Sequence, residues 1–217
     1  MIWLISTHKV NDVVKGGYMN EKFFDLKKEK QDRMINAALK IFAKNGYAHA
    51  STDDIVKEAG ISKGLLFHYF INKIGLYSFI YDYSAKFISL EMTGTVDKSD
   101  NDYFSLQLQI KSAFAAVMKS YPYMVAFMYS TEHEDVVEAM REIYDKKDIV
   151  PKKIREYLDY ANTAGIKAGT DISKLDEMIE YTSEAVMRKT LPVNEDRPEN
   201  YLAEIKKHIL MLRDFNR

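Results

Sequence analysis

The sequence predicts an all-α fold, with a small N-terminal helical domain followed by a larger one. Apolar residues recur at helical spacing along most of the 217 residues, whereas alternating β-type patterns and internal repeats are absent. Four Pro and nine Gly also suit helices better than a turn-rich β fold. A chain of this length can bury a sizeable core, as one medium domain or as a small domain and a larger one.

The first predicted helix covers residues 26–45, where the apolar positions fall on one face. Asn45 and Gly46 then supply a left-handed stop. After a short loop, Ser51 or Thr52 can cap a second helix through its side-chain oxygen. Two amphipathic helices in close succession are therefore expected here.

Gly60 breaks the second helix, and Ser62 is placed to cap a short third helix over residues 63–71. Asn72 ends that helix. A longer fourth helix then carries its apolar residues toward Glu91.

Residues 93–101 are the most polar and turn-prone stretch of the interior, which predicts a domain boundary there. Three of the four Pro residues lie near expected helix starts, where Pro is tolerated. Six more helices are predicted beyond the boundary, over residues 102–120, 122–132, 134–145, 149–162, 172–190 and 198–216.

The expected organisation is a DNA-binding part over residues 19–90, with its motif at 51–70, and a regulatory part over 91–217. Residues 1–18 are expected to be a flexible or non-native extension. Codons for the run from Lys15 to Tyr18 can resemble a ribosome-binding site, which favours Met19 as the start. The alternative is a genuine extension that packs Trp3 and Leu4 on the body.

The composition excludes several classes of protein. There is no Cys, so disulfides, thiolate metal sites and cysteine nucleophiles are ruled out. No apolar run approaches the ~18 residues that a membrane span needs, and the first five residues are too short for a signal peptide. The expected location is cytoplasmic, with no membrane partner.

The predicted second and third helices, joined by a tight turn at Gly60, form a helix-turn-helix whose second member can enter a DNA major groove. Leu66 and Phe70 share its inward face, which turns Gly64, Leu65 and His68 toward a partner. The missing side chain of Gly64 would let DNA come close to the backbone.

Charged and aromatic side chains surround this face. Lys63 and Lys73 bracket the helix with positive charge, while Phe67, His68 and Tyr69 offer groups for sugar or phosphate. Taken singly, Phe67 and Tyr69 could be core aromatics, His68 a surface residue and the lysines solvated. Their joint occurrence directly after the run from Ala59 to Ser62 favours DNA binding.

The residues that match a known pattern, T..I...AG.SKG.LYHYF..K..L, are Thr52, Ile55, Ala59, Gly60, Ile61, Ser62, Lys63, Gly64, Leu66, His68, Tyr69, Phe70, Asn72, Lys73 and Leu76. Residues 37–47 match the preceding AAL.IF...GY. In these motifs the chain resembles the TetR family of bacterial transcriptional regulators over about residues 28–88.

The resemblance implies a homodimer that binds a double-stranded operator with two-fold symmetry, usually as a repressor released by a small ligand. It carries DNA contacts to Thr52, Ser62, Lys63, Gly64, Leu65, His68, Tyr69 and Lys73, with Phe67 beside them on the same helix. Whether the regulator represses or activates stays open.

Four positions depart from the family pattern. Phe67 lacks the hydroxyl of the usual Tyr, and Leu65 can offer only apolar contact, such as with a thymine methyl group. Ile71 and Ile74 replace commonly charged residues, which suggests extra packing under the third helix.

The charge is unevenly distributed. The whole chain has 31 basic and 32 acidic side chains, a net charge of −1. Residues 19–90 carry eleven basic and eight acidic side chains, whereas residues 91–217 carry eighteen and twenty-three. Because exposed charges are screened beyond ~8 Å in physiological salt, the acidic body need not repel DNA held at the basic head. The modest excess of +3 predicts weak non-specific DNA affinity.

Bulky side chains crowd residues 103–129, more than one core face needs. This favours a pocket for a small apolar or aromatic effector, although filling of a bundle core is the alternative. The pocket candidates are Phe104, Phe114, Met118, Tyr121, Tyr123, Phe127, Met128, Tyr157, Met178 and Tyr181.

The last two predicted helices carry apolar stripes. The resemblance implies that these helices pair with their symmetry mates as a four-helix interface, but they could instead close the monomer's own core. The dimer candidates are Ile179, Val186, Tyr201, Ile205, His208, Ile209 and Leu212.

No enzyme signature accompanies these features. The five His are scattered, and the neighbours Glu132, His133, Glu134 and Asp135 point around a helix rather than at one metal. Walker, GxGxxG, GxSxG and kinase signatures are absent. We therefore expect no enzyme, cofactor or metal. The alternatives are a small helical enzyme that uses the aromatic pocket and a regulator controlled by a protein partner.

Overall fold

The computed structural model describes residues 19–190 and 197–217, and these form helices without a β-strand. Their backbones contribute only two isolated β-bridges, one between Met19 and Phe70 and one between Asp102 and Asn162. The expected N-terminal extension lies outside the described residues. The predicted all-α fold is confirmed.

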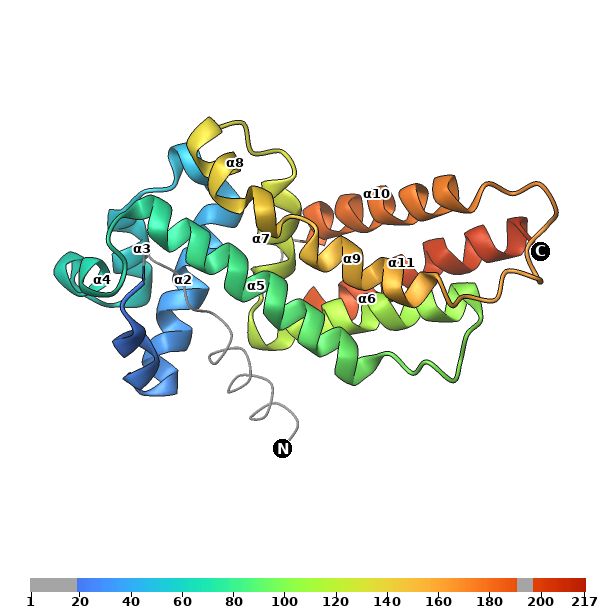
Figure 1. The fold of residues 1–217 in the computed structure, drawn as a ribbon, viewed down its shortest axis with the longest axis horizontal. Helices are drawn as coiled ribbons and strands as arrows, with labels where there is room; N and C mark the ends of the chain where they lie inside the picture. Colours follow the sequence, from blue (N-terminus) through green and yellow to red (C-terminus); the bar gives the residue numbers. More distant parts are fainter. Residues whose placement is uncertain (1–18, 191–196) are drawn as a thin grey trace.

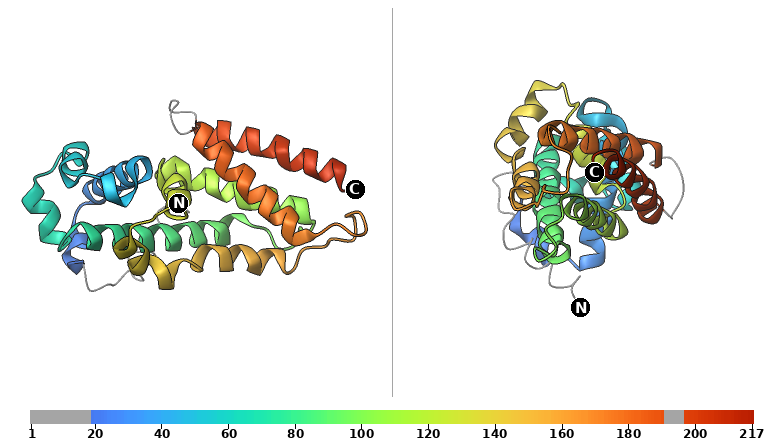
Figure 2. Two further views of the ribbon diagram at one scale, coloured as in Figure 1. Left: turned by 90° about the horizontal axis from the view of Figure 1, so that it is seen from above. Right: turned by 90° about the vertical axis from the view of Figure 1, so that its right-hand side faces the viewer.

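The N-terminal elements are η1 (Glu21–Asp25), α2 (Lys28–His49), α3 (Thr52–Ala59), α4 (Lys63–Tyr69) and α5 (Lys73–Thr95). The remaining elements are α6 (Tyr103–Ser120), α7 (Met124–Thr131), α8 (Val137–Ile143), η2 (Tyr144–Lys146), α9 (Ile149–Leu158), α10 (Ile172–Thr190) and α11 (Arg197–Phe215). The molecule is elongated, with α3 and α4 at one end and the C-terminus at the other (Figures 1 and 2).

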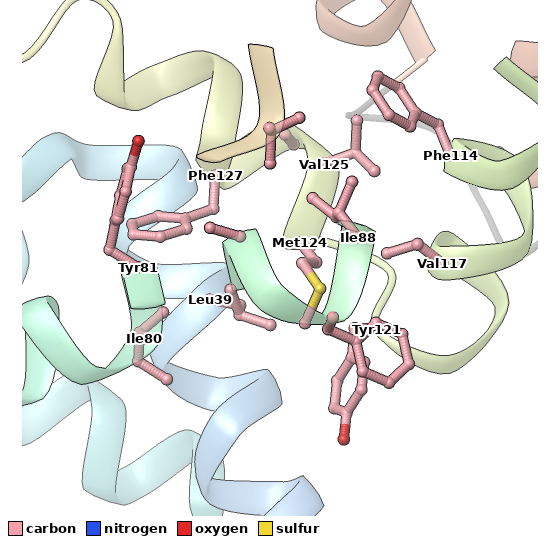
Figure 3. Packing of buried hydrophobic residues seen from close by; sticks show 14 of the residues in the cluster. Leu39, Ile80, Tyr81, Ile88, Phe114, Val117, Tyr121, Met124, Val125 and Phe127 are labelled. Carbon is pink, nitrogen blue, oxygen red and sulfur yellow. The ribbon is translucent and has the colours of Figure 1, made fainter. Parts of the chain in front are cut away.

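The long helix α5 connects the two ends and is the centre of the core. Residues 74–85 are all buried, so α5 has no solvent-facing polar side along this stretch. In Figure 3, Ile80 and Ile88 of α5 lie among side chains of α2, α6 and α7, such as Leu39, Val117 and Met124. One apolar cluster thus runs through both parts of the chain.

The helix α5 ends at Thr95, within residues 93–101, the stretch in which we expected the domain boundary. The chain leaves the helix at Val96, which is extended. Because α5 packs against α2 on one side and α6 on the other, the two parts share a helix.

Some expected helix ends agree with the structure within two residues, but α2 continues past the expected end at Asn45 to His49, and three other helices also differ. The helix expected over 63–71 ends at Tyr69 because Phe70 is extended and pairs with Met19. The expected helix over 134–145 begins only at Val137, since the Glu134 carboxylate accepts the backbone N–H of Val136. The helix expected over 149–162 ends at Leu158.

None of the helices described is long and apolar enough to span a membrane.

Candidate nucleic-acid interface

Local capping residues shape the helix-turn-helix. Ser51 caps α3 by accepting the N–H of Asp53 at 3.1 Å, and Ser62 caps α4 by accepting the N–H of Leu65 at 3.2 Å. Between the two helices, Gly60 adopts a left-handed conformation with φ of 63°, which favours glycine. The chain therefore turns at the position expected from its sequence.

Helix α4 buries one side and exposes the other. Leu66 and Phe70 are buried, as their spacing predicts, and Leu65 is half-buried against the core. Gly64 and His68 are exposed on the outer side. This outer side, formed by Lys63, Gly64, Phe67 and His68, is called the α4 face below.

The two neighbouring aromatics of α4 have opposite environments. Phe67 is 36% exposed, which makes it available to a partner. Tyr69 is only 8% exposed, and its ring lies edge-on to Phe23 with 5.7 Å between centroids. The structure therefore favours a core role for the Tyr69 ring and a surface role for Phe67.

Gly64 has open space around its Cα. A Cβ added there would meet no atom of the protein within 4 Å, and its backbone is helical. The fold of this chain alone does not require glycine at this position. A close external neighbour, such as a DNA backbone, would require it.

The two lysines next to α4 have different partners. The ammonium of Lys63 pairs with Asp53 at 2.9 Å, and both side chains are largely exposed. The ammonium of Lys73 donates to the carbonyl of Ala48 at 3.3 Å and lies 4.4 Å from the centre of the Tyr47 ring. Burial lowers the pKa of Lys73. Lys63 is thus the freer of the two to reach a phosphate.

Ile71 and Ile74 also differ. Ile74 is buried, as expected for an apolar residue at a position that is commonly charged in the family. Ile71 is 65% exposed because it lies in the bend between α4 and α5, so the expected packing under α4 is wrong for Ile71.

The segment before α2 supports α4 from behind, which we did not predict. Asn20 donates its N–H to the carbonyl of Tyr69 at 2.8 Å, and the Phe23 ring packs among Tyr69, Phe70 and Phe79. Asn20 caps η1 by accepting the N–H of Lys22. The capping residue followed by two Phe residues is the signal that could have predicted this.

A second unpredicted contact ties the C-terminal end of α2 to the α7–α8 loop. Gly46 has φ of 65° and kinks α2, in agreement with the expected left-handed stop. The next residue, Tyr47, donates its N–H to the Glu134 carboxylate at 2.8 Å. Burial and the nearby Glu138 carboxylate raise the pKa of Tyr47 to about 12.

Buried hydroxyl groups link α2 to the body elsewhere. The Tyr121 hydroxyl donates to Asp32 of α2 at 2.6 Å and lies 2.8 Å from the Tyr83 hydroxyl of α5. Burial raises the pKa of Tyr121, so this hydroxyl stays protonated. Tyr121 is therefore a link between elements rather than a pocket residue.

A cavity of about 440 Å³ lies in the C-terminal part, between α5, α6, α7, α9 and α10. Of the pocket candidates, Phe114, Met128 and Tyr181 line it. The other candidates, Phe104, Met118, Tyr121, Tyr123, Phe127, Tyr157 and Met178, do not. Figure 3 shows four residues that line it, Tyr81, Ile88, Phe114 and Val125.

The candidates that miss the cavity have other roles. Phe104, Met118, Phe127 and Tyr157 are buried in the core, where a residue's neighbours depend on how the helices pack. The Tyr123 ring lies near the ammonium of Lys44, 5.5 Å from the ring centre, and Met178 is exposed on α10.

The dimer candidates mostly face inward. Ile179, Val186, Tyr201, Ile205, Ile209 and Leu212 are buried within the single chain, because α11 packs on α6 and α10. This agrees with the alternative that these stripes close the monomer's own core. Of the seven, His208 is the one with a partly exposed side chain. The exposed apolar residues of α11 are instead Met211 and Phe215.

Within the described residues, no group of three or more His, Asp or Glu side chains could hold a metal ion.

Comparison with known proteins identifies relatives for the N-terminal part. Residues 34–78 match the family described as bacterial regulatory proteins, tetR family. The HTH-type transcriptional regulator YuxN of Bacillus subtilis is 47% identical over 49 residues, which cover 23% of this chain and 17% of YuxN. UidR of Escherichia coli, another HTH-type transcriptional regulator, is 48% identical over 44 residues, 20% of this chain and 22% of UidR. The matched segments thus span about a fifth of these relatives.

Solved structures extend the likeness to the whole fold. A TetR family transcriptional regulator from Chloroflexus aurantiacus has a TM-score of 0.61 at 20% identity, covering 92% of this chain and 96% of the other. FadR from Bacillus subtilis, solved in complex with stearoyl-CoA, has a TM-score of 0.56 at 20% identity, covering 83% and 96%. The helical C-terminal part therefore has the architecture of such regulators.

Proposed function

Because residues 34–78 match the family described as bacterial regulatory proteins, tetR family, and the whole fold is similar to that of such regulators, we propose that this chain is a ligand-responsive repressor that binds a palindromic operator as a homodimer. The observation that carries the proposal is the α4 face, where Gly64 has no close neighbour and Lys63 is exposed beside it. Such a face lets a recognition helix approach the DNA backbone closely.

Each candidate residue has a specific role in this proposal. Lys63, the Ser62 hydroxyl and the N-terminal Thr52 of α3 contact phosphates, while His68 and Phe67 lie against the sugar-phosphate backbone. Leu65 makes an apolar base contact. Lys73 and Tyr69 act mainly by holding α4 and α5 in place, since both already have partners inside the protein.

Replacing Lys63 with alanine is expected to weaken operator binding and to flatten its dependence on salt. Each phosphate contact that is lost lowers the slope of log K against log salt by about 0.9, and a dimer loses one contact per half-site. The operator affinity is measured over a range of salt concentrations, with a duplex selected from random DNA by the unaltered protein.

The matched control is Lys98→Ala. Lys98 lies in the loop after α5, at the opposite end of the molecule from α4 (Figure 1), with its ammonium near the Tyr157 ring. This control should leave the salt slope unchanged. An unchanged slope in the Lys63 variant would show that Lys63 does not touch a phosphate.

We place the dimer contact on the exposed side of α11 rather than on its buried stripe. Met211 and Phe215 lie one turn apart and line a shallow groove together with Leu210. Lys207 and Asp214 lie toward opposite ends of this groove, which suits an antiparallel second copy. A second copy would also supply the second recognition helix that a palindromic site needs.

The double substitution Met211→Glu and Phe215→Glu is expected to produce a monomer. Bringing these carboxylates together in an apolar contact costs several kcal/mol of association free energy, because charges lose their hydration there. Light scattering at micromolar concentration measures the mass. Tyr144→Glu, at an exposed aromatic outside α11, is the control and should remain a dimer. A double variant that stays dimeric would place the interface elsewhere.

The release of DNA is proposed to start at the cavity. Glu132 and His133 line it. In the same loop, the Glu134 carboxylate accepts the backbone N–H of Tyr47. The Tyr47 ring in turn lies beneath the ammonium of Lys73, at the start of α5. A ligand that moves this loop would change how α4 is held. The stearoyl-CoA in the related FadR structure supports a small molecule with an apolar chain as the type of effector. By linkage, effector and operator should weaken each other's binding equally.

A further inference from the structure

The cavity has an apolar wall and polar side chains from several elements, of which those on α6 and α10 are called the polar end below. The wall includes Ile88, Phe114, Val125, Met128 and Ile154, which come from four different helices. The polar end comprises the side chains of α6 and α10, chiefly Gln107, Asp176 and Glu180. A ligand that contacts both this wall and the polar end would have an apolar body and a polar group.

The Asp176 carboxylate at the polar end has only neutral hydrogen-bond donors. Its Oδ1 accepts from the Tyr103 hydroxyl at 2.6 Å and from Nε2 of Gln107 at 2.8 Å. In the described part of the chain no basic side chain pairs with it. Burial and the nearby Glu180 carboxylate raise the pKa of Asp176, although the two hydrogen bonds and the Lys111 ammonium oppose this shift.

Gln107 has an acceptor without a partner. The residue is 1% exposed, and its Nε2 points to Asp176, which assigns the orientation of the amide. The other atom, Oε1, accepts no hydrogen bond from any described residue. A buried acceptor in this state costs free energy, which a donor on a ligand would recover.

The nearby cations are already paired. The buried ammonium of Lys111 pairs with Glu180, and the Arg155 guanidinium pairs with Asp148 at 2.5 Å. The His133 ring lies 2.7 Å from the Glu184 carboxylate. Lys147 is the remaining basic residue of the lining. A ligand that placed an anionic group beside Lys147 would still leave Asp176 without a basic partner and Oε1 of Gln107 without a hydrogen-bond donor.

Building on the proposed function, we propose that the effector is an amphipathic amine, whose ammonium group binds between Asp176 and Oε1 of Gln107 and whose apolar body lies along the cavity wall. Both protein atoms are acceptors, and an ammonium has three donors and a positive charge. The apolar wall contributes affinity without selecting a particular chain or ring.

The test compares three probes of equal chain length, decylamine, decan-1-ol and decanoate. Their binding to the full chain is measured by calorimetry near neutral pH, without DNA and below the concentrations at which they form micelles. Decylamine is expected to bind at least about tenfold more tightly than decanol, and decanoate more weakly than decanol.

Asp176→Asn keeps the shape of the side chain and removes its charge. It should reduce decylamine affinity by about tenfold and leave decanol affinity unchanged, which also shows that the cavity is intact. Glu177→Gln is the matched control, because Glu177 is exposed on the same helix, pairs with Lys174 and lies outside the lining. If the Asn variant does not fold, Gln107→Leu and the three-probe comparison still test the proposal.

Three results would overturn the proposal. They are decanoate binding more tightly than decylamine, an Asp176 variant that keeps the full amine affinity, and no binding of any probe. DNA binding is measured separately with the selected duplex. If any of these results is found while DNA binding is intact, the amine site alone is refuted. If the protein binds neither the probes nor DNA, the proposed function is refuted too.

Discussion

Gly64→Ala is expected to reduce operator affinity by at least about tenfold while leaving the folded protein as stable or more stable. The added Cβ meets no atom within 4 Å in the free protein, so it causes no strain. Alanine also favours a helix over glycine by up to about 1 kcal/mol. The loss would arise only in the complex, where a methyl group separates the α4 backbone from DNA at both half-sites. A loss of about 1 to 3 kcal/mol of binding free energy per half-site corresponds to at least about a tenfold loss of operator affinity.

Gly94→Ala is the matched control for this prediction. Gly94 lies in α5, its Cβ would also meet nothing within 4 Å, and it is at the far end of α5 from α4. The control should gain helix stability in the same way without any change in operator affinity. Urea unfolding gives the stability and titration of the selected duplex gives the affinity. If Gly64→Ala bound DNA as tightly as the unaltered protein, α4 would not approach DNA at this residue.

Glu180→Ala is expected to lower the free energy of unfolding by about 3 to 5 kcal/mol, because it leaves the Lys111 ammonium buried without a counterion. The Lys111 side chain is 0% exposed, whereas that of Glu180 is 37% exposed. Removing Glu180 should therefore lower the free energy of unfolding more than removing Lys111. Lys111→Met leaves a Glu180 carboxylate that water can reach, and we expect a loss within about 2 kcal/mol.

Urea unfolding at a fixed protein concentration measures these differences. Glu177→Ala removes an exposed ion pair on the same helix and should cost no more than about 0.5 kcal/mol. The double variant Lys111→Met with Glu180→Ala should recover most of the stability lost in Glu180→Ala, since no buried charge remains. Equal losses for Glu180→Ala and Lys111→Met would contradict the assigned cause.

Two neighbouring residues show how far the sequence predicts the candidate interface. Phe67 and Tyr69 are both aromatic, and we expected both to contact DNA, Tyr69 from the resemblance and Phe67 from its place on the same helix. The structure buries the Tyr69 ring against Phe23 and leaves Phe67 at the surface. The partner that covers Tyr69 comes from a segment more than 40 positions earlier in the chain. Helical spacing alone contains no information about that partner.

The helices and the helix-turn-helix with its caps at Ser51 and Ser62 could be predicted from the amino-acid sequence, because capping, glycine turns and helical periodicity depend on residues a few positions apart. The packing of the helices was needed to show that the apolar stripes of α10 and α11 face inward, and that Gln107 contacts Asp176, 69 positions later in the chain. Such contacts depend on which helix faces pack together, and helices with several apolar faces permit more than one arrangement. The local motif therefore predicted DNA binding, whereas the chemistry of the cavity emerged only after the helices were placed.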